Sequence, residues 1–197
     1  MSASAAGFVP GSGAGMVMLE SLESAEARGA EIIAEVLGSG INCGGHRGGG
    51  SMTAPNPESV KRCIQAALAD AKIEGSDVDV INGHLTATGA DPKEIGSWSR
   101  GLSRTPDDFP KITATKSLIG HALGAAGGLE AVASLLMLKG GFLQPAINCE
   151  DVHPEIAAFD KSIPHEGGEL EDFNIIAKAG FGFGDVNACV IFKKWDS

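Results

Sequence analysis

Two histidines and one lysine stand where side chains could take part in chemistry. His84 directly follows the strand-like segment "VDVING", and Lys116 lies five residues before His121 at the start of a run of small, apolar residues. Burying such groups without partners costs on the order of several kcal/mol. We therefore expect these groups either to be paired in the structure or to be used by it.

The position of His121 favours a neutral imidazole. We expect it in the first turn of an apolar helix, where the positive end of the helix dipole opposes protonation. A neutral imidazole can donate a hydrogen bond to a developing oxyanion. His84 is placed at a strand end that opens into a loop, which is where α/β folds commonly locate their chemistry. Taken alone, a histidine at such a position is more often a hydrogen-bonded structural residue than a catalytic one.

Glu130 is the polar group best placed to meet Lys116. If both are buried, an ion pair is the economical arrangement, and the sequence leaves open whether that pair braces a loop or takes part in catalysis. Thr53, Thr86 and Thr88 are either ordinary loop threonines or hydroxyls that bind an amide-rich ligand arm. The other histidines, in polar or glycine-rich loops, receive no role: they are His46, His153 and His165.

The surrounding pattern predicts strands that alternate with helices. Residues 14–20 and 31–37 are predicted strands separated by a helix-like 21–29, and 41–51 is predicted to be a loop. Asn56 and Pro57 mark the start of an amphipathic helix. The remaining predictions are strands at 77–83, 111–115, 142–148, 173–180 and 187–194, a helix from Asp91 through Trp98, a buried helix at 120–138, and a turn at 181–185.

This alternation predicts a single α/β layered domain over residues 1–197. The apolar helix at 120–138 should form its centre. Two glycine-rich stretches, "PGSGAG" and "GFGFG", do not have the strand-before, helix-after setting of a dinucleotide-binding loop, so we interpret both as turns.

Composition excludes several classes of protein. With 197 residues, 43% hydrophobic residues and a net charge of -10, the chain has enough apolar content for a core and no basic stripe for nucleic acid. We identify no apolar run of about 18 residues and no signal peptide, so a cytoplasmic protein without a membrane segment is expected. The four cysteines form no metal-binding or disulfide pattern, and we expect reduced core thiols and no metal site.

Several motifs together resemble the β-ketoacyl-acyl carrier protein synthases, the condensing enzymes of fatty acid and polyketide synthesis. "INGHLTAT" resembles the first histidine loop of that family, and "TKSLIGHALGAAGGLEA" resembles its segment with the lysine and second histidine. "GFGFGDVNACVIFKK" resembles its closing strand pair, and "GFVPGSGAGMVMLESLESAEARGA" the opening of its second half. The resemblance covers essentially the whole chain and implies the C-terminal half of a thiolase-like fold.

The resemblance also implies roles for individual residues. His84 and His121 would bind the thioester carbonyl of a malonyl-acyl carrier protein and support its decarboxylation, while Lys116 and Glu130 would organise the pocket. Phe183 matches a gating phenylalanine beside Phe181. Thr53, Thr86 and Thr88 match positions near the phosphopantetheine arm of the acyl carrier protein, so no bound cofactor of the chain itself is implied.

The chain also departs from the family pattern. The family's nucleophilic cysteine lies in its first half, and no cysteine here has that context. Leu85 replaces a usual glycine, Asp185 and Val186 replace a usual Gly-Thr pair, and Ala179 and Gly180 replace a usual Asn-Ser pair. We therefore expect a partner chain with the complementary N-terminal half, and homo- or hetero-oligomers. Because this chain is acidic, we expect any basic docking patch for the carrier protein to lie mostly on that other half.

Three hypotheses follow from the resemblance. The chain is half of an active condensing enzyme, a non-elongating partner similar to a chain-length factor, or part of an assembly that only decarboxylates malonyl thioesters. We also expect the isolated chain to expose a large apolar patch, because it would be half of a two-half fold.

Overall fold

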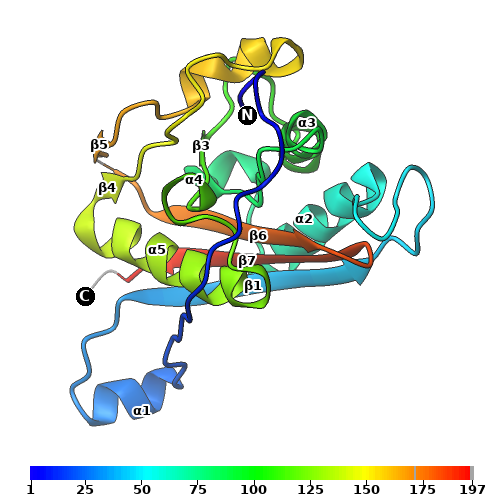
Figure 1. The fold of residues 1–197 in the computed structure, drawn as a ribbon. Coiled ribbons are helices and arrows are strands. Elements are labelled where there is room, and N and C mark those ends of the chain that lie inside the picture. The colour runs from blue at the N-terminus through cyan, green and yellow to red at the C-terminus, as the bar shows by residue number, and fades with distance from the viewer. Residues whose placement is uncertain (171, 196–197) are drawn as a thin grey trace.

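A five-stranded mixed sheet in the order β1-β7-β6-β2-β3 forms the middle of the structure (Figure 1). The computed structural model describes residues 1–170 and 172–195. The sheet's strands are β1 (Ala34–Cys43), β2 (Val80–Asn82), β3 (Lys111–Thr113), β6 (Ile175–Gly182) and β7 (Val186–Lys194). The β1–β7 and β7–β6 pairs are antiparallel, whereas β2 is parallel to both β6 and β3.

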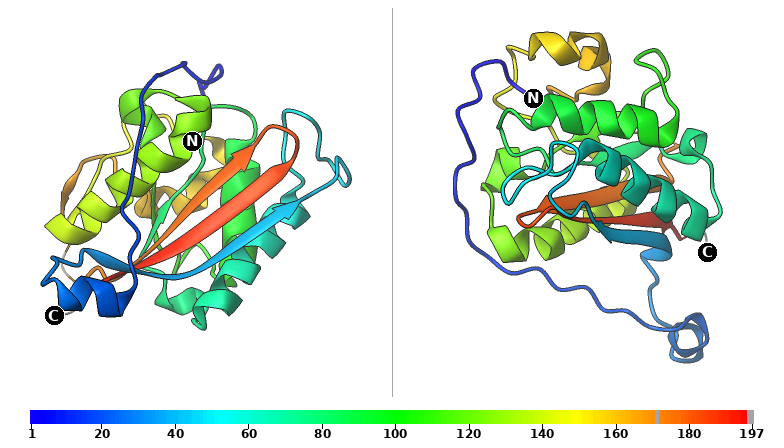
Figure 2. Two further views of the ribbon diagram at one scale, coloured as in Figure 1. Left: turned by 90° about the horizontal axis from the view of Figure 1, so that it is seen from below. Right: turned by 90° about the vertical axis from the view of Figure 1, so that its right-hand side faces the viewer.

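Helices cover both faces of this sheet (Figure 2). α2 (Pro57–Ala71) and α3 (Asp91–Leu102) lie on one face, and α5 (Ala126–Gly140) lies on the other. Each face has its own hydrophobic cluster, one containing Ile64 and Trp98 and one containing Met137 and Ile176. This arrangement confirms the predicted α/β layered fold.

The remaining elements are short. They are α1 (Leu22–Ala27), η1 (Gly75–Asp77), α4 (Lys116–Ile119), η2 (Leu123–Ala125), β4 (Phe142–Leu143), η3 (Pro154–Ser162) and β5 (Gly168–Glu169). β4 and β5 pair with each other in a separate two-stranded sheet. The predicted strand at 142–148 was therefore too long, because only its first two residues find a partner strand.

Local sequence signals placed most elements correctly. The side chain of Asn56 accepts a hydrogen bond from the backbone N–H of Glu58 at 3.0 Å, and Pro57 occupies the first turn of α2, as predicted. The loop predicted from residue 41 begins later, because Ile41 and Cys43 still pair with Ala188 and Val186 of β7. The predicted turn at 181–185 is shorter, since its first two residues end β6.

The predicted strand at 14–20 is wrong. This segment makes no strand ladder with another part of the chain that the structure describes, and it runs along α5 toward α1, which stands apart from the sheet (Figures 1 and 2). Met16, Met18 and Leu19 are 87%, 83% and 71% exposed. A strand-like apolar run therefore remains without a partner strand, and Met16, Met18 and Leu19 are left exposed.

The helix predicted at 120–138 also differs from the structure. Gly120 has φ +76° and Leu123 has φ +50°, so the chain bends between α4 and η2 before α5 begins. α5 is not enclosed on every side: Glu130 and Met137 are buried, whereas Leu136 is 53% exposed. The central helix thus presents one apolar face that this chain does not cover.

The apolar run is longer than the sequence pattern suggested. Residues Leu123–Gly140 pass the length and composition test for a membrane-spanning helix, which corrects the expectation that no run is long enough. The core helix of a folded domain passes the same test. α5 packs against β6 and carries an ion-paired Glu130, so the helix is an integral part of this fold.

Three of the four cysteines are buried, as expected of core thiols: Cys63, Cys149 and Cys189. Cys43 is exposed, because it ends the edge strand β1 where the chain turns outward. All four thiols are free.

Candidate active site

Two adjacent parallel strands deliver the candidate catalytic residues. β2 ends at Asn82 and leads to His84, and β3 ends at Thr113 and leads to Lys116 at the start of α4. Because β2 and β3 are parallel neighbours, their carboxyl ends lie at the same edge of the sheet. The bend after Gly120 then brings His121 back to this edge.

The two imidazole rings face each other edge to face. The ring centroids of His84 and His121 are 5.3 Å apart, with an interplanar angle of 84°. Burial lowers the pKa of His84 to about 2, helped by the positive charge of Lys116. Burial and Lys116 also lower the pKa of His121. Both rings are therefore neutral near pH 7, as the sequence predicted for His121 by a different route.

Local hydrogen bonds select the tautomer of His121. Its Nδ1 accepts the backbone N–H of Leu123 at 3.1 Å, so a neutral ring carries its proton on Nε2. The residue lies just before η2 and not in the first turn of α5, so a single backbone N–H, and not the dipole of a long helix, sets this arrangement. The ring presents Nε2–H as a donor.

The N-terminal segment holds His121 in place. The backbone N–H of His121 donates to Val9 O at 2.8 Å, and its carbonyl accepts the N–H of Gly11 at 2.9 Å. Gly11 fits closely, since a Cβ there would lie 2.5 Å from Ile119 O. The rings of Phe8 and His121 pack in a T-shaped arrangement, with their centroids 5.0 Å apart. The stretch that we interpreted as a turn is thus an extended strap over the second histidine.

Glu130 binds two lysines. Its Oε1 pairs with Lys116 Nζ, and its Oε2 lies 3.0 Å from Lys178 Nζ on β6. All three side chains are less than 10% exposed. Burial lowers the pKa of Lys116, and the charge of Glu130 opposes that shift. The expected Lys116–Glu130 pair is present, and Lys178 was missed, although a single lysine in the apolar run "IIAKAG" was a signal.

A buried network of amide and hydroxyl hydrogen bonds lies next to the Lys–Glu–Lys cluster. Asn82 Nδ2 lies 3.0 Å from both Thr115 Oγ1 and Ser134 Oγ, and 3.2 Å from Glu130 O. Gln144 Nε2 donates to the same Thr115 hydroxyl at 2.9 Å. The network joins the ends of β2 and β3 to α5, so it fixes Glu130 relative to the strand ends. Sequence reasoning missed this network, because its members are far apart in the chain.

Two acidic residues of α3 shape the first histidine loop. Glu94 accepts the backbone N–H groups of His84 at 2.7 Å and Leu85 at 2.9 Å, and Asp91 accepts that of Thr86 at 3.0 Å. Leu85 has φ +24°, a backbone conformation that favours glycine. Burial raises the pKa of Glu94 to about 7. These carboxylates were also missed, although the Asp-x-x-Glu spacing in the first turn of a helix was visible.

His84 has an unsatisfied ring nitrogen. Its Nδ1 is buried and finds no hydrogen-bond partner among residues 1–170 and 172–195. The rings of His84 and Phe181 are in a T-shaped arrangement, with their centroids 6.2 Å apart and an interplanar angle of 69°. Buried polar groups are rarely left without partners. The nitrogen therefore marks a place where a ligand group can complete the site.

A cavity of about 510 Å³ opens beside His121 and Lys116 and includes Thr86 in its lining. Thr86 Oγ1 lies 3.1 Å from Thr88 Oγ1, so the two predicted hydroxyls are adjacent. The other predicted site residues are not part of this lining: His84, Glu130, Thr53, Thr88, Phe181 and Phe183. Thr53 is exposed on the loop before α2, and Phe183 is 58% exposed in the turn between β6 and β7.

The site contains no cluster of metal ligands. Within the described part of the chain, no group of three or more histidine, cysteine, aspartate or glutamate side chains could hold a metal ion. What the arrangement offers is two neutral imidazole donors beside a Lys–Glu–Lys cluster.

The chain matches a known protein family over most of the segments that form this site. Residues 33–150 match the family described as "Beta-ketoacyl synthase, C-terminal domain". This match covers more than half of the chain, and the chain therefore belongs to the β-ketoacyl synthase family of condensing enzymes in fatty acid and polyketide synthesis. The resemblance stated from the sequence is confirmed.

Individual relatives agree with this assignment. The chain is 42% identical over 190 residues to the chloroplastic 3-oxoacyl-[acyl-carrier-protein] synthase I of Arabidopsis thaliana, covering 95% of this chain and 38% of that protein. The ishigamide ketosynthase/chain length factor structure superposes with a TM-score of 0.89 at 36% identity, covering 99% of this chain and 46% of that one.

A second solved structure is also similar. It is a type II polyketide synthase acyl-carrier protein in complex with its ketosynthase bound to the hexaketide, and it matches with a TM-score of 0.79 at 29% identity. The match covers 90% of this chain and 42% of that one. The chain thus spans less than half the length of these relatives, and their fold confirms the thiolase-like C-terminal half.

Proposed function

We propose that this chain supplies the His84, His121, Lys116 and Glu130 half of a condensing site. The reaction is the decarboxylative Claisen condensation of a malonyl-acyl carrier protein with an acyl thioester. The pair of neutral imidazoles 5.3 Å apart carries the proposal, because it offers two hydrogen-bond donors to one oxygen atom. The remaining half of the site comes from the part of the relatives' length that this chain does not span.

The chemistry follows from these donors. The malonyl thioester carbonyl accepts hydrogen bonds from the two histidines, and the bond to the carboxylate carbon breaks to release CO₂. The electron pair moves toward the carbonyl, whose oxygen becomes an enolate stabilised by His84 and His121. The enolate carbon then attacks the acyl thioester on a cysteine of the other half, and that cysteine leaves as a thiolate.

The remaining residues position the substrate. Lys116 and Glu130 keep the site's electrostatics fixed, and the positive charge of Lys116 helps to keep His84 neutral. Thr86 and Thr88 supply hydroxyls for the amide-rich phosphopantetheine arm of the carrier. Thr53 and the Phe181–Phe183 hairpin are proposed to contact the same arm outside the cavity.

The test uses the chain assembled with the N-terminal half of a relative. CO₂ release and acyl chain length are measured with malonyl-acyl carrier protein for the wild type, His121→Ala and the control His153→Ala. We expect His121→Ala to lose both activities on the order of 10²- to 10³-fold. The control residue His153 is the N-cap of η3 and is distant from His121 in the sequence. Its variant should keep both CO₂ release and acyl chain elongation.

The same assay separates the two alternatives. If His121→Ala leaves elongation intact, the chain is a non-elongating partner, which the match to a ketosynthase/chain length factor structure makes the second candidate. If the wild type releases CO₂ without a longer acyl product, the assembly is only a malonyl-thioester decarboxylase.

A further inference from the structure

A cysteine, a histidine and an aspartate form a cluster that the candidate condensing site does not use. Cys149 lies on the loop after β4, Asp160 lies in η3, and His165 follows three residues after the end of η3. The Sγ atom of Cys149 is 3.8 Å from Nδ1 of His165, and Nε2 of His165 is 2.8 Å from Oδ1 of Asp160. The three side chains thus follow one another in the order thiol, base and orienting carboxylate, which is the order found around activated nucleophiles.

The carboxylate selects the tautomer of His165. An ionised carboxylate only accepts hydrogen bonds, so Nε2 carries a proton and donates it to Asp160. A neutral ring then has an unprotonated Nδ1, which is the atom that faces the sulfur. His165 is therefore arranged as a base toward the thiol.

The thiol of Cys149 needs such a base. Burial raises the pKa of this thiol, so the sulfur keeps its proton near pH 7. The thiol donates this proton to the carbonyl oxygen of Ala146 at 2.8 Å. Rotation about the Cβ–Sγ bond turns the same proton toward Nδ1 of His165 without moving a heavy atom. The base can thus accept the proton while the sulfur attacks.

Cys149 also lines the cavity of about 510 Å³ beside His121 and Lys116. His165 is not part of this lining, so the base does not occupy the space that a substrate would fill. Much of the wall is apolar, as ligand cavities of this size commonly are. The apolar residues are Phe8, Val9, Leu85, Ala114, Leu118 and Ile147. A thiol in such a wall is placed to meet a ligand with an alkyl chain.

Hydrogen bonds fix the loop of the thiol relative to the imidazole. The backbone N–H of Ala146 donates to the carbonyl of Pro164, the residue before His165, at 2.7 Å. On the other side of the thiol, the carbonyl of Asp151 accepts the N–H of Ala3 at 2.6 Å. The loop is thus held before and after the cysteine, and a fixed geometry is what a nucleophile and its base require.

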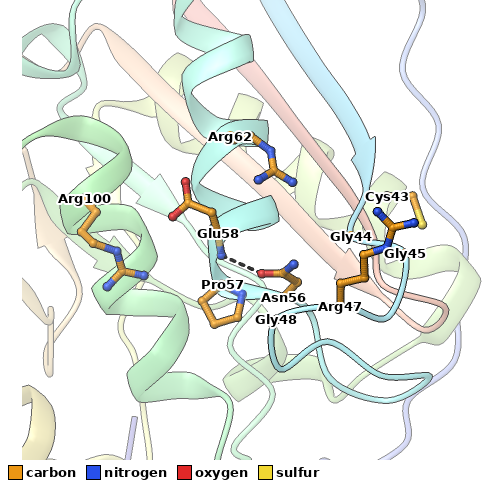
Figure 3. A pocket seen from close by; sticks show the side chains of 10 residues that line it. All are labelled: Cys43, Gly44, Gly45, Arg47, Gly48, Asn56, Pro57, Glu58, Arg62 and Arg100. Carbon is orange, nitrogen blue, oxygen red and sulfur yellow. Dashed lines mark hydrogen bonds between the residues drawn. The ribbon is translucent and has the colours of Figure 1, made fainter.

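The exposed thiol of this chain provides a comparison. Cys43 lines a separate hollow of about 790 Å³ between the loop after β1, the start of α2 and the end of α3 (Figure 3). Among the described residues that line this hollow, none is a histidine. The Sγ atom of Cys43 lies 3.6 Å from the carbonyl oxygen of Gly184. Cys43 therefore has exposure without a base, whereas Cys149 has a base and a cavity.

We propose that Cys149 is an acyl-accepting nucleophile of this chain, with His165 as its base and Asp160 as the residue that positions the base. The substrate class is an acyl thioester whose alkyl chain enters the cavity, and this choice of class rests on the condensing function proposed above. The proposal gives a role to His165, to which the sequence assigned none.

The step is a thioester exchange that needs no further reactant. The sulfur of Cys149 attacks the carbonyl carbon of the thioester, and its proton passes to Nδ1 of His165. The bond between that carbon and the sulfur of the leaving thiol then breaks, and the proton passes from Nδ1 to the leaving sulfur. The acyl group remains on Cys149 as a new thioester.

The experiment treats the full chain with hexanoyl-N-acetylcysteamine and follows the added hexanoyl mass by intact mass spectrometry, with peptide mapping to locate it. Every protein carries Cys43→Ser, which removes the exposed thiol. The variants are Cys149→Ser, His165→Asn, Asp160→Asn and Asp160→Glu. Glu155→Gln is the matched control, since Glu155 is an exposed carboxylate of η3 outside the cluster. Circular dichroism verifies that each variant is folded.

We expect one hexanoyl group per chain, located on Cys149 and absent from Cys149→Ser. His165→Asn should slow the transfer on the order of 10²-fold, because it removes a general base. Asp160→Asn should slow the transfer by about tenfold and Asp160→Glu should recover most of the rate, because only a carboxylate holds the proton on Nε2. The control Glu155→Gln should change the rate less than about twofold.

Two results would overturn the proposal. The first is transfer to Cys149 that is no faster than transfer to free N-acetylcysteine under the same conditions. The second is an unchanged rate in folded His165→Asn, which would mean that the imidazole only packs against the thiol.

A parallel assay separates this proposal from the condensing function. CO₂ release from malonyl-acyl carrier protein is measured for the assembled wild type and for His121→Ala. If CO₂ release depends on His121 while Cys149 takes up no hexanoyl group, the nucleophile fails and the condensing function stands. If Cys149 is acylated with the expected dependence on His165 while the wild type releases no CO₂, the condensing function fails and the nucleophile stands.

Discussion

Glu130 is the residue on which the buried charges of this protein depend. It is 1% exposed and forms ion pairs with Lys116 and Lys178, so Glu130→Gln removes the carboxylate that both buried ammonium groups contact. We expect a loss of about 3 kcal/mol in the free energy of unfolding, measured by urea denaturation. The control is Glu31→Gln, which removes an exposed pair with Lys139 and should cost less than about 1 kcal/mol. Equal losses would contradict the structural role of the cluster.

The neutral state of His84 gives stability a definite pH dependence. The pKa of His84 is about 2 in the folded state and near 6.5 in the unfolded state. At a pH between these values, the imidazole is protonated in the unfolded state and neutral in the folded state. Its contribution is therefore complete above pH 6.5 and declines as the pH falls, by up to about 1.4 kcal/mol per pH unit. His84→Asn should flatten this decline in urea denaturation series from pH 7 to pH 5.

Glu94 acts in the opposite direction and provides the comparison. Its folded pKa of about 7 lies above the ordinary 4.5, so the folded state keeps a proton that the unfolded state loses. Its contribution is complete below pH 4.5 and is lost as the pH rises through 7. Glu94→Gln should make stability rise more steeply with pH between 4.5 and 6.5, whereas His84→Asn should make it rise less. A shift of both slopes in the same direction would contradict the burial of one of these groups.

At the scale of elements, the N-terminal strap crosses α5 where two glycines meet. A Cβ on Gly128 would lie 2.4 Å from Gly15 O, so Gly128→Ala should push the strap away from the helix. We expect faster hydrogen exchange in residues 9–15 and weaker positioning of His121. Gly127→Ala is the control, because its Cβ would meet only Lys178 Nζ at 3.8 Å and alanine favours a helix by about 1 kcal/mol. Unchanged exchange in Gly128→Ala would mean that the strap is not held there.

Local signals predicted elements well where a residue acts on its own neighbours. Asn56 and Pro57 predicted the start of α2, and the apolar runs around Ile176 and Ile191 predicted β6 and β7. The segment 14–20 has a similar apolar run but no strand ladder, because a strand also needs a neighbour that local sequence does not reveal.

The candidate site shows the same division. The sequence brought out His84, His121, Lys116 and Glu130, since titratable residues in apolar runs are visible without a structure. It missed Lys178, which meets Glu130 only because α5 packs on β6. Contacts between residues 48 positions apart depend on how the helix and sheet layers pack, and the hydrophobic periodicity of the sequence does not predict that packing.

At the scale of the whole molecule, the chain exposes apolar side chains along one continuous part of its sequence. Met16 and Met18 are 87% and 83% exposed beside α5, which itself leaves Leu136 uncovered. We expect the isolated chain to self-associate at micromolar concentration, as measured by native mass spectrometry, because burial of such surface is favourable. The double variant Met16→Lys/Met18→Lys should shift it toward monomer, whereas Met52→Lys, at a 59% exposed methionine on the loop before α2, should not. A monodisperse wild-type monomer would show that the uncovered face is stable in water, and it would remove the main physical reason for expecting the other half of the fold to bind there.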